Sequence, residues 1–267
     1  MAQRIEVIAH RGASSEEPEH SLAAYLRAVE QGADGIECDV RLTRDGVLVC
    51  HHDRRINRTS SGRGVVSART YDELAQHDFK YGHENGHSLQ SHPHRSQLLT
   101  LRSLLTVMLG ASSTLKFSIE TKHPNRYRRR LEQALFAMLD EFGLLASGGQ
   151  GSADSAESRV RLMSFSRTAA EWMATNAPGN PTAFLLDPIR MRWRDGSLPA
   201  GVDIAGPSIE TLRKHPGYVA KVRAMGAQVH VWTVDEEPDV DLCVDLGVDA
   251  IITNRPGFVR ERLGAVG

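Results

Sequence analysis

Two acidic residues, Glu37 and Asp39, stand two positions apart in an apolar segment that covers residues 35–40. Side chains alternate between the two faces of a β-strand, so this spacing predicts that both carboxylates point the same way. A third acid, Glu120, has a similar setting in the segment 116–122. Carboxylates held together repel one another, and a bound cation relieves that repulsion. The three acids therefore predict a site for one hard divalent metal ion, and Mg²⁺ and Ca²⁺ both suit such ligands.

A histidine and an arginine follow the first strand-like segment, residues 4–10. His10 ends this segment, and Arg11 comes directly after it. A histidine at the end of a strand can take part in proton transfer, and an arginine can bind an anion through two parallel hydrogen bonds. The pair is thus a candidate for acid–base chemistry on an anionic substrate.

A second histidine pair closes the segment 47–52. His51 and His52 are adjacent, so in a continuing strand they point to opposite faces and at most one of them enters a common site. We expect that residue to be His52, because Asp53 and the following loop mark the end of the strand. His51 is then a packed or hydrogen-bonded histidine.

The elements that must position these residues alternate along the chain. Strand-like segments are followed by helix-like ones, which favours a parallel α/β architecture. The predicted strands cover residues 4–10, 35–42, 47–52, 116–121, 160–165, 182–187, 203–208, 228–234 and 250–254. The predicted helices cover residues 21–31, 101–109, 125–142, 167–176, 209–225 and 238–246. About eight such units in 267 residues, without a glycine-rich nucleotide loop, favour a (β/α)8 barrel in a single domain, residues 1–267, over a doubly wound sheet.

Two stretches interrupt the alternation. Residues 54–100 are polar and too long for an ordinary strand–helix connection, so we expect an insertion on the rim that carries the site. Residues 146–158 are rich in Gly and Ser, which predicts a flexible connector on the opposite rim.

Composition argues against several classes of partner. The chain has 32 Lys and Arg against 33 Asp and Glu, so no overall field favours nucleic acid or a membrane surface. We see no signal peptide and no apolar run near the ~20 residues that span a bilayer. The three cysteines fit neither a zinc motif nor an even set of disulfides, so we expect buried free thiols and a cytoplasmic protein.

Taken together, the short motifs form an ordered set that resembles the glycerophosphodiester phosphodiesterase family. The match extends from residue 8 to about residue 257 and consists of His10-Arg11-Gly12, Pro18-Glu19, Glu37-x-Asp39, Asp45-Gly46, His52-Asp53, Glu120-x-Lys122, Trp232-Thr233-Val234 and Ile252-Thr253-Asn254-Arg255-Pro256. The resemblance implies a TIM barrel like that of phosphatidylinositol phospholipase C. It also implies a divalent metal and hydrolysis of glycerophosphodiesters to glycerol 3-phosphate and an alcohol.

The resemblance also implies roles for individual residues. Glu37, Asp39 and Glu120 would bind the metal, and His10 and His52 would be the acid–base pair. Arg11 and Lys122 would hold phosphate oxygens, Glu19 would support the site through hydrogen bonds, and Trp232 would pack against the glycerol or the alcohol. The glycerol 2-hydroxyl would attack first to give a cyclic phosphate, although direct attack by water and the order in which the histidines act stay open.

Two positions depart from the family pattern. His20 stands where the family usually has Asn, which concerns the hydrogen bonds around the site rather than the metal. Asn254 stands where an Asp is common, and either residue can hydrogen-bond there.

Three other functions compete with this hypothesis. A phospholipase C- or D-like enzyme would act on an intact or lyso-phospholipid, and an apolar membrane-binding rim or an export signal would favour it. A metal-dependent sugar isomerase or aldolase barrel would not require the His10-Arg11 and His52-Asp53 motifs. A non-catalytic sensor would bind the diester and the metal without turnover. The preferred alcohol and the oligomeric state stay open.

Overall fold

The computed structural model describes residues 4–79, 96–146, 158–188 and 191–266. The strands in these residues are β1 (Glu6–His10), β2 (Gly35–Leu42), β3 (Leu48–Cys50), β4 (Lys116–Thr121), β5 (Val160–Ser164), β6 (Thr182–Leu186), β7 (Ile204–Pro207), β8 (Gln228–Val231) and β9 (Ala250–Thr253). Each of them falls within a segment that the sequence predicts as a strand.

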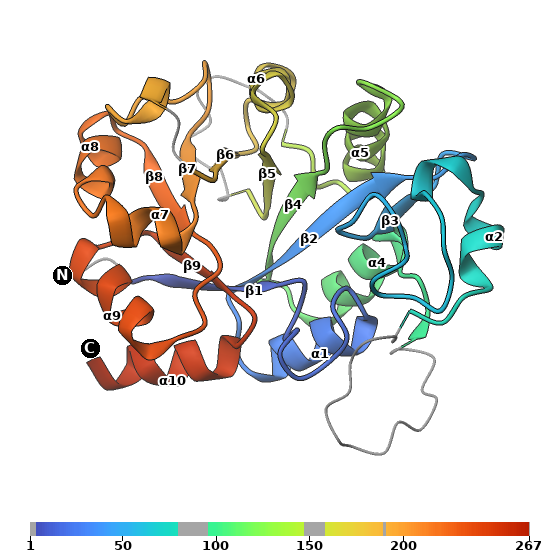
Figure 1. Ribbon diagram of the computed structural model, residues 1–267, viewed down its shortest axis with the longest axis horizontal. Coiled ribbons are helices and arrows are strands. Elements are labelled where there is room, and N and C mark those ends of the chain that lie inside the picture. Colours follow the sequence, from blue (N-terminus) through green and yellow to red (C-terminus); the bar gives the residue numbers. More distant parts are fainter. Residues whose placement is uncertain (1–3, 80–95, 147–157, 189–190, 267) are drawn as a thin grey trace.

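Eight of these strands close a parallel barrel within the described residues. Their order around the barrel is β1, β2, β4, β5, β6, β7, β8 and β9, and the barrel closes because β1 pairs with both β2 and β9. The (β/α)8 fold predicted from the sequence is thereby confirmed (Figure 1). In such barrels the carboxyl ends of the strands meet at one rim, where active sites lie.

Strand β3 pairs with the barrel but is not one of its eight strands. It runs antiparallel to β2 and pairs with it from Val40 onward. Strand β1 uses the same edge of β2 only as far as Glu37. The hairpin therefore continues the sheet where β1 ends, and it carries the chain after Cys50 back over the carboxyl end of β1.

The helices surround the barrel (Figure 1). They are α1 (Leu22–Glu30), α2 (Tyr71–Ala75), α4 (Leu101–Ala111), α5 (Arg130–Glu141), α6 (Arg167–Asn176), α7 (Ile209–Lys214), α8 (Tyr218–Ala224), α9 (Glu237–Leu246) and α10 (Pro256–Val266), with short 3₁₀ turns η1 (Val66–Ala68) and η2 (Met191–Trp193). Ser21 caps α1 by accepting a hydrogen bond from the Ala24 amide at 3.1 Å. Gly32 follows that helix with a φ of 75°, which glycine adopts without strain.

Two predicted helices differ from the structure, and two observed helices were not predicted. The segment 209–225 forms two helices, because Pro216 cannot donate a helical hydrogen bond and forces His215 out of the helical conformation. Helix α5 begins at Arg130 rather than at residue 125. The sequence prediction also missed α10 and the one-turn helix α2, which begins with a capping box between Thr70 and Glu73.

The alternation of side chains separates core from site. In β4, Phe117 and Ile119 are buried against apolar residues of α4 and α5. Ser118 and Glu120, which alternate with them, take the opposite face, toward the barrel interior. One strand thus anchors the outer helices with one face and presents a carboxylate with the other.

The described part of the insertion packs on β3 through a small core of its own. Ile56, Val66, Leu74 and Phe79 bury their side chains together with Val49 of β3. This cluster makes the insertion an ordered wall beside the barrel over residues 54–79. Residues 80–95 of the insertion and 147–157 of the expected connector lie outside the described residues.

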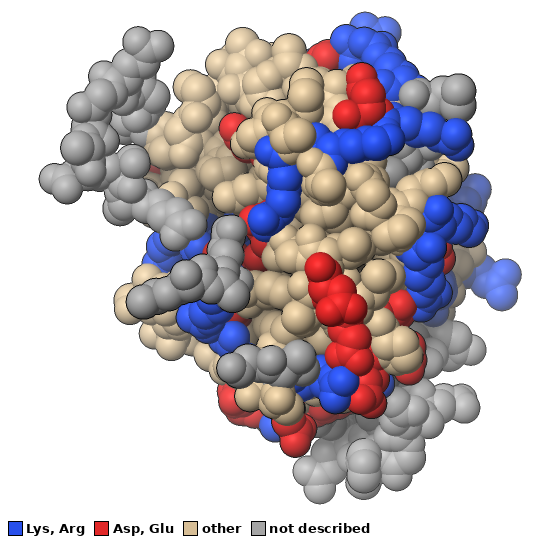
Figure 2. Space-filling view, turned by 90° about the vertical axis from the view of Figure 1, so that its left-hand side faces the viewer, with Lys and Arg blue, Asp and Glu red and all other residues tan. Residues whose placement is uncertain are grey.

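Charge is mixed over the surface as the composition predicts. Figure 2 shows basic and acidic side chains interspersed with uncharged ones on one face of the molecule. Among the described residues, no helix is both long and apolar enough to cross a membrane.

Candidate active site

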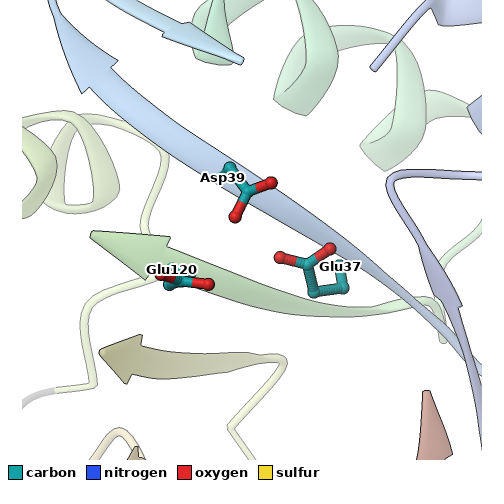
Figure 3. A group of neighbouring side chains, drawn as sticks. All are labelled: Glu37, Asp39 and Glu120. Carbon is teal, nitrogen blue, oxygen red and sulfur yellow. The ribbon is translucent and has the colours of Figure 1, made fainter. Parts of the chain in front are cut away.

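The three predicted metal ligands converge at the carboxyl end of two neighbouring strands. Glu37 and Asp39 project from β2, and Glu120 projects from β4, where it is the register partner of Asp39 (Figure 3). One carboxylate oxygen from each residue lies within 4.8 Å of the other two, and all three side chains are buried. The β-strand spacing that aims Glu37 and Asp39 together therefore produces a compact group of oxygen ligands.

Burial makes it costly for all three acids to be charged at once. Burial and the nearby Asp39 raise the pKa of Glu37 well above its usual range. Burial and Asp39 likewise raise the pKa of Glu120 to about 8. Burial also raises the pKa of Asp39, but Lys122, a hydrogen bond from His20 and Arg11 outweigh it and hold that pKa well below its usual range.

Two cations from the family motif lie against these acids. Lys122 Nζ is 2.8 Å from Glu120 Oε1 and 3.3 Å from Asp39 Oδ1. Arg11 places Nε 3.1 Å from Asp39 Oδ2, and its backbone amide donates to Glu37 at 3.1 Å. Three carboxylates thus face two cations, so the positive charge present does not match the charge of the fully ionised group.

This excess of acid is what a divalent metal would balance. The group offers three buried carboxylate oxygens and no sulfur or imidazole, a donor set that suits Mg²⁺ or Ca²⁺. A cation bound to Glu37, Asp39 and Glu120 would also leave Arg11 and Lys122 free to face a substrate anion.

His10 is held by Asn254, the residue that follows β9. Its Nδ1 lies 2.7 Å from Asn254 Oδ1, while the Asn254 amide NH₂ donates to Asp235 Oδ2 at 2.6 Å. Because Asp235 can only accept, the Asn254 oxygen must face His10, and His10 Nδ1 must carry the proton. Burial and Arg11 lower the pKa of His10 to about 3. His10 is thus neutral, with Nε2 available to accept a proton.

His52 reaches the site through the β2–β3 hairpin. Its Nδ1 lies 2.7 Å from Asp53 Oδ1, so the carboxylate orients the ring and leaves Nε2 available for proton transfer. Arg58 of the insertion donates to Asp53 at 2.8 Å and to both oxygens of Glu19 at 2.6 and 2.8 Å. Glu19 also accepts from Arg11 at 3.1 Å. One chain of charges therefore connects His52 to Arg11.

The two histidines and the acids face a cavity of about 140 Å³, which we call the central cavity. It is lined by His10, Arg11, Glu37, His52, Glu120, Lys122, Met163, Phe165, Leu185, Trp232 and Ile252. One side is polar and the other apolar. On the apolar side Phe165 meets the Trp232 ring edge to face at 5.4 Å, and 41% of Phe165 is exposed. An exposed aromatic ring at a cavity mouth is available to pack against a ligand.

The structure brings together all nine residues that the sequence singled out. Seven line the central cavity, namely His10, His52, Arg11, Lys122, Trp232, Glu37 and Glu120. Asp39 completes the acidic group beside them, and Glu19 lies at the edge, where it accepts from Arg11. His51 instead lies outside the cavity, buried, with its Nε2 3.2 Å from the Arg55 carbonyl oxygen.

Sequence reasoning did not assign the contacts of several residues that shape this site. His20 lies 2.9 Å from Asp39 through Nε2 and 2.8 Å from the Tyr25 hydroxyl through Nδ1, so it fixes a predicted metal ligand. Its departure from the family pattern was the available signal. The position of Asn254 in a family motif was a signal for its contact with His10, whereas nothing in the local sequence marked Arg58 or Phe165.

Comparisons with known proteins identify the family of this chain. The family model described as "Glycerophosphoryl diester phosphodiesterase family" matches residues 10–258. The "Probable glycerophosphodiester phosphodiesterase 1" of Mycobacterium tuberculosis H37Rv is 43% identical over 257 residues, covering 96% of this chain and 92% of that protein. The glycerophosphodiester phosphodiesterase of Bacillus subtilis is 30% identical and covers 97% and 86%.

Solved structures share the fold. A glycerophosphodiester phosphodiesterase from Parabacteroides distasonis has a TM-score of 0.77 at 25% identity, with 100% and 99% of the two chains covered. A phosphodiesterase from Oleispira antarctica, solved with the product sn-glycerol-3-phosphate, has a TM-score of 0.78 at 22% identity, with 97% and 96% covered. Since the family model spans nearly the whole chain and the fold and motifs agree with it, this chain belongs to the glycerophosphoryl diester phosphodiesterase family and is a phosphoric diester hydrolase.

Proposed function

We propose that this enzyme hydrolyses glycerophosphodiesters to glycerol 3-phosphate and an alcohol, with one divalent metal ion and two histidines. The observation that carries the proposal is the arrangement of the central cavity, where a buried group of three carboxylates lies beside two oriented histidines and two cations. The names of the relatives and the product bound to the Oleispira protein support the substrate class.

The two histidines divide the proton transfers. His10 is neutral and its Nδ1 is committed to Asn254, so Nε2 accepts the proton of the attacking hydroxyl. Burial lowers the pKa of His52, but its carboxylate partner Asp53 opposes that shift and favours the protonated ring, so His52 protonates the leaving oxygen. Each such transfer is typically worth ~10²–10⁴-fold in rate.

The negative charge of the phosphodiester is balanced by cations of the central cavity. Arg11 and Lys122 lie at the polar side of the central cavity and bind the non-bridging oxygens of the phosphodiester. A divalent metal held by Glu37, Asp39 and Glu120 would polarise a phosphoryl oxygen and lower the pKa of a bound hydroxyl. Trp232 and Phe165 pack against the carbon atoms of the glycerol.

The test is release of glycerol 3-phosphate from a panel of glycerophosphodiesters by the purified enzyme with Mg²⁺ or Ca²⁺. We expect His10→Ala and His52→Ala each to lower kcat by on the order of 100-fold or more. His215→Ala, an exposed histidine after α7, is the control and should retain wild-type turnover. Near-wild-type rates in both site variants, or turnover of intact phospholipid alone, would contradict the proposal. A cytoplasmic location stays a prediction.

A further inference from the structure

A second and larger cavity adjoins the central one, with Lys122 in the lining of both. It measures about 480 Å³ and lies between the insertion and the chain that follows β4. We call it the basic cavity, and it is lined by Arg41, Leu42, Arg54, Val65, Val66, Ser67, Ala68, Lys122, Pro124, Asn125, Arg126 and Tyr127. The mechanism above uses only Lys122 of this set.

The lining holds four cationic residues and no carboxylate. Arg54 and Arg126 are exposed, and among the described residues neither side chain forms an ion pair. The positive charge of Arg54 and Arg126 is therefore not compensated by a neighbouring carboxylate, and an anion bound in the basic cavity would compensate it.

The walls of the cavity are fixed by hydrogen bonds. The Tyr127 hydroxyl donates to the Ser67 carbonyl at 2.7 Å and so joins the chain after β4 to the insertion. Arg41 donates through Nε and Nη2 to the His52 carbonyl at 2.9 and 2.6 Å. Because Arg41 is bonded to His52, the basic cavity lies directly beside the residue that we propose protonates the leaving oxygen.

A third cavity, of about 400 Å³ on the His10 side, has a different character. Its lining mixes Arg11 and Arg255 with Glu19, Asp235 and Glu236. Glu19 is paired with Arg58, and Asp235 accepts from Asn254, so much of that negative charge is already used. In the basic cavity, by contrast, the described lining holds cations and no carboxylate.

We propose that the basic cavity receives the leaving alcohol of the diester and favours alcohols that carry a second anionic group, a phosphate or a carboxylate. The inference rests on the proposed function, because it assumes that a phosphodiester occupies the central cavity. The apolar wall of Trp232 and Phe165 then takes the glycerol, and the alcohol extends past His52 toward Arg41, Arg54 and Arg126.

The test compares diesters that release glycerol 3-phosphate but differ in the alcohol. Glycerophosphoinositol and its 4-phosphate form the matched pair, a carboxylate-bearing alcohol is the second anionic arm, and glycerophosphocholine is the cationic arm. We expect wild-type kcat/KM to be higher for the anionic alcohols, and added salt to reduce that preference. The double variant Arg54→Gln/Arg126→Gln should lower the anionic-to-neutral ratio of kcat/KM by roughly tenfold.

Neighbouring arginines supply the control. Arg55 and Arg128 are exposed and lie outside the cavity lining, so Arg55→Gln/Arg128→Gln should keep the wild-type ratio. The inference is overturned if the ratio is the same in both double variants, or if glycerophosphocholine is preferred. If the wild-type enzyme turns over glycerophosphodiesters without any charge preference, the proposed function stands and only the inference falls. If it turns over none of them, both fall together.

Discussion

At the scale of single residues, burial and the charge of Asp39 raise the pKa of both Glu37 and Glu120. Both lie in a low-dielectric setting next to Asp39, whose charge is stabilised by Lys122 and Arg11. The structure thus resolves the repulsion among the three acids by keeping one ionised and making the other two reluctant to ionise. A protein that only needed a stable strand end would not have to bear this cost.

Metal binding should therefore depend on pH. Burial and Asp39 raise the pKa of Glu120 to about 8, so the metal-free site holds a proton below that pH. A carboxylate ligand must be deprotonated, so each pH unit below about 8 should weaken Mg²⁺ or Ca²⁺ affinity by up to about tenfold. Calorimetric titration of EDTA-treated protein at several pH values, in buffers of different ionisation enthalpy, measures the affinity and the protons released.

Glu120→Gln provides the control for this effect. It removes the titrating group, so metal binding should be weaker and should release fewer protons than in the wild type. Wild-type affinity that does not change between about pH 6 and 8 would show that the acids bind no metal or are already ionised.

At the scale of elements, the turn between β1 and α1 decides where His10 and Arg11 lie. Gly12 has a φ of 85°, and a Cβ there would come within 2.5 Å of the Ala24 backbone carbon. Gly46 has nearly the same backbone, with a φ of 87°, yet a Cβ there would meet nothing within 4 Å. Substitution of Gly46 therefore measures the cost of the backbone conformation alone, and substitution of Gly12 adds the cost of close approach to the helix.

Alanine at these two positions should have unequal effects. Gly46→Ala should lower the free energy of unfolding by about 1–2 kcal/mol, the cost of a left-handed backbone. Gly12→Ala should lower it by a further ~1–3 kcal/mol from the steric clash, and it should reduce kcat/KM because Arg11 moves with the turn. Urea denaturation and steady-state kinetics give both quantities. Equal losses at the two sites would refute the close-approach argument.

The elements themselves were largely accessible from the sequence. Periodicity located every barrel strand, because alternation in β2 and β4 reflects a local geometry that each strand imposes on itself. It was less successful with helices, since one run of helical spacing over 209–225 conceals the break at Pro216. It also gave no sign that β3 would pair antiparallel with β2 outside the barrel, because pairing depends on a partner distant in sequence.

At the scale of the whole molecule, stability and chemistry lie on opposite faces of the same strands. Phe117 is fully buried between the barrel and the outer helices, whereas Glu120 three residues later faces the site. The barrel therefore holds the site rigidly through a core that contains none of its reacting groups. Phe165, in the loop after β5, is instead partly exposed at the central cavity.

Two aromatic substitutions should separate these roles. Phe117→Ala should lower the free energy of unfolding by about 3–5 kcal/mol and leave kcat of the folded enzyme close to wild type. Phe165→Ala should change stability by less than about 1 kcal/mol and raise KM, because it removes an exposed wall of the central cavity. Denaturation curves and kinetics on both variants test this. A large stability loss in Phe165→Ala would show that its ring belongs to the core.

The sequence alone indicated the family, the barrel strands and the acids, histidines and cations of the candidate site, because these follow from local alternation and short ordered motifs. Only the tertiary structure decided how those groups are held. Asn254 meets His10 across 244 residues, and Arg58 meets Glu19 across 39, through barrel closure and the folding back of the insertion. The basic cavity likewise has walls from the hairpin, the insertion and the chain after β4. Such contacts depend on the packing of distant segments, which no local pattern records.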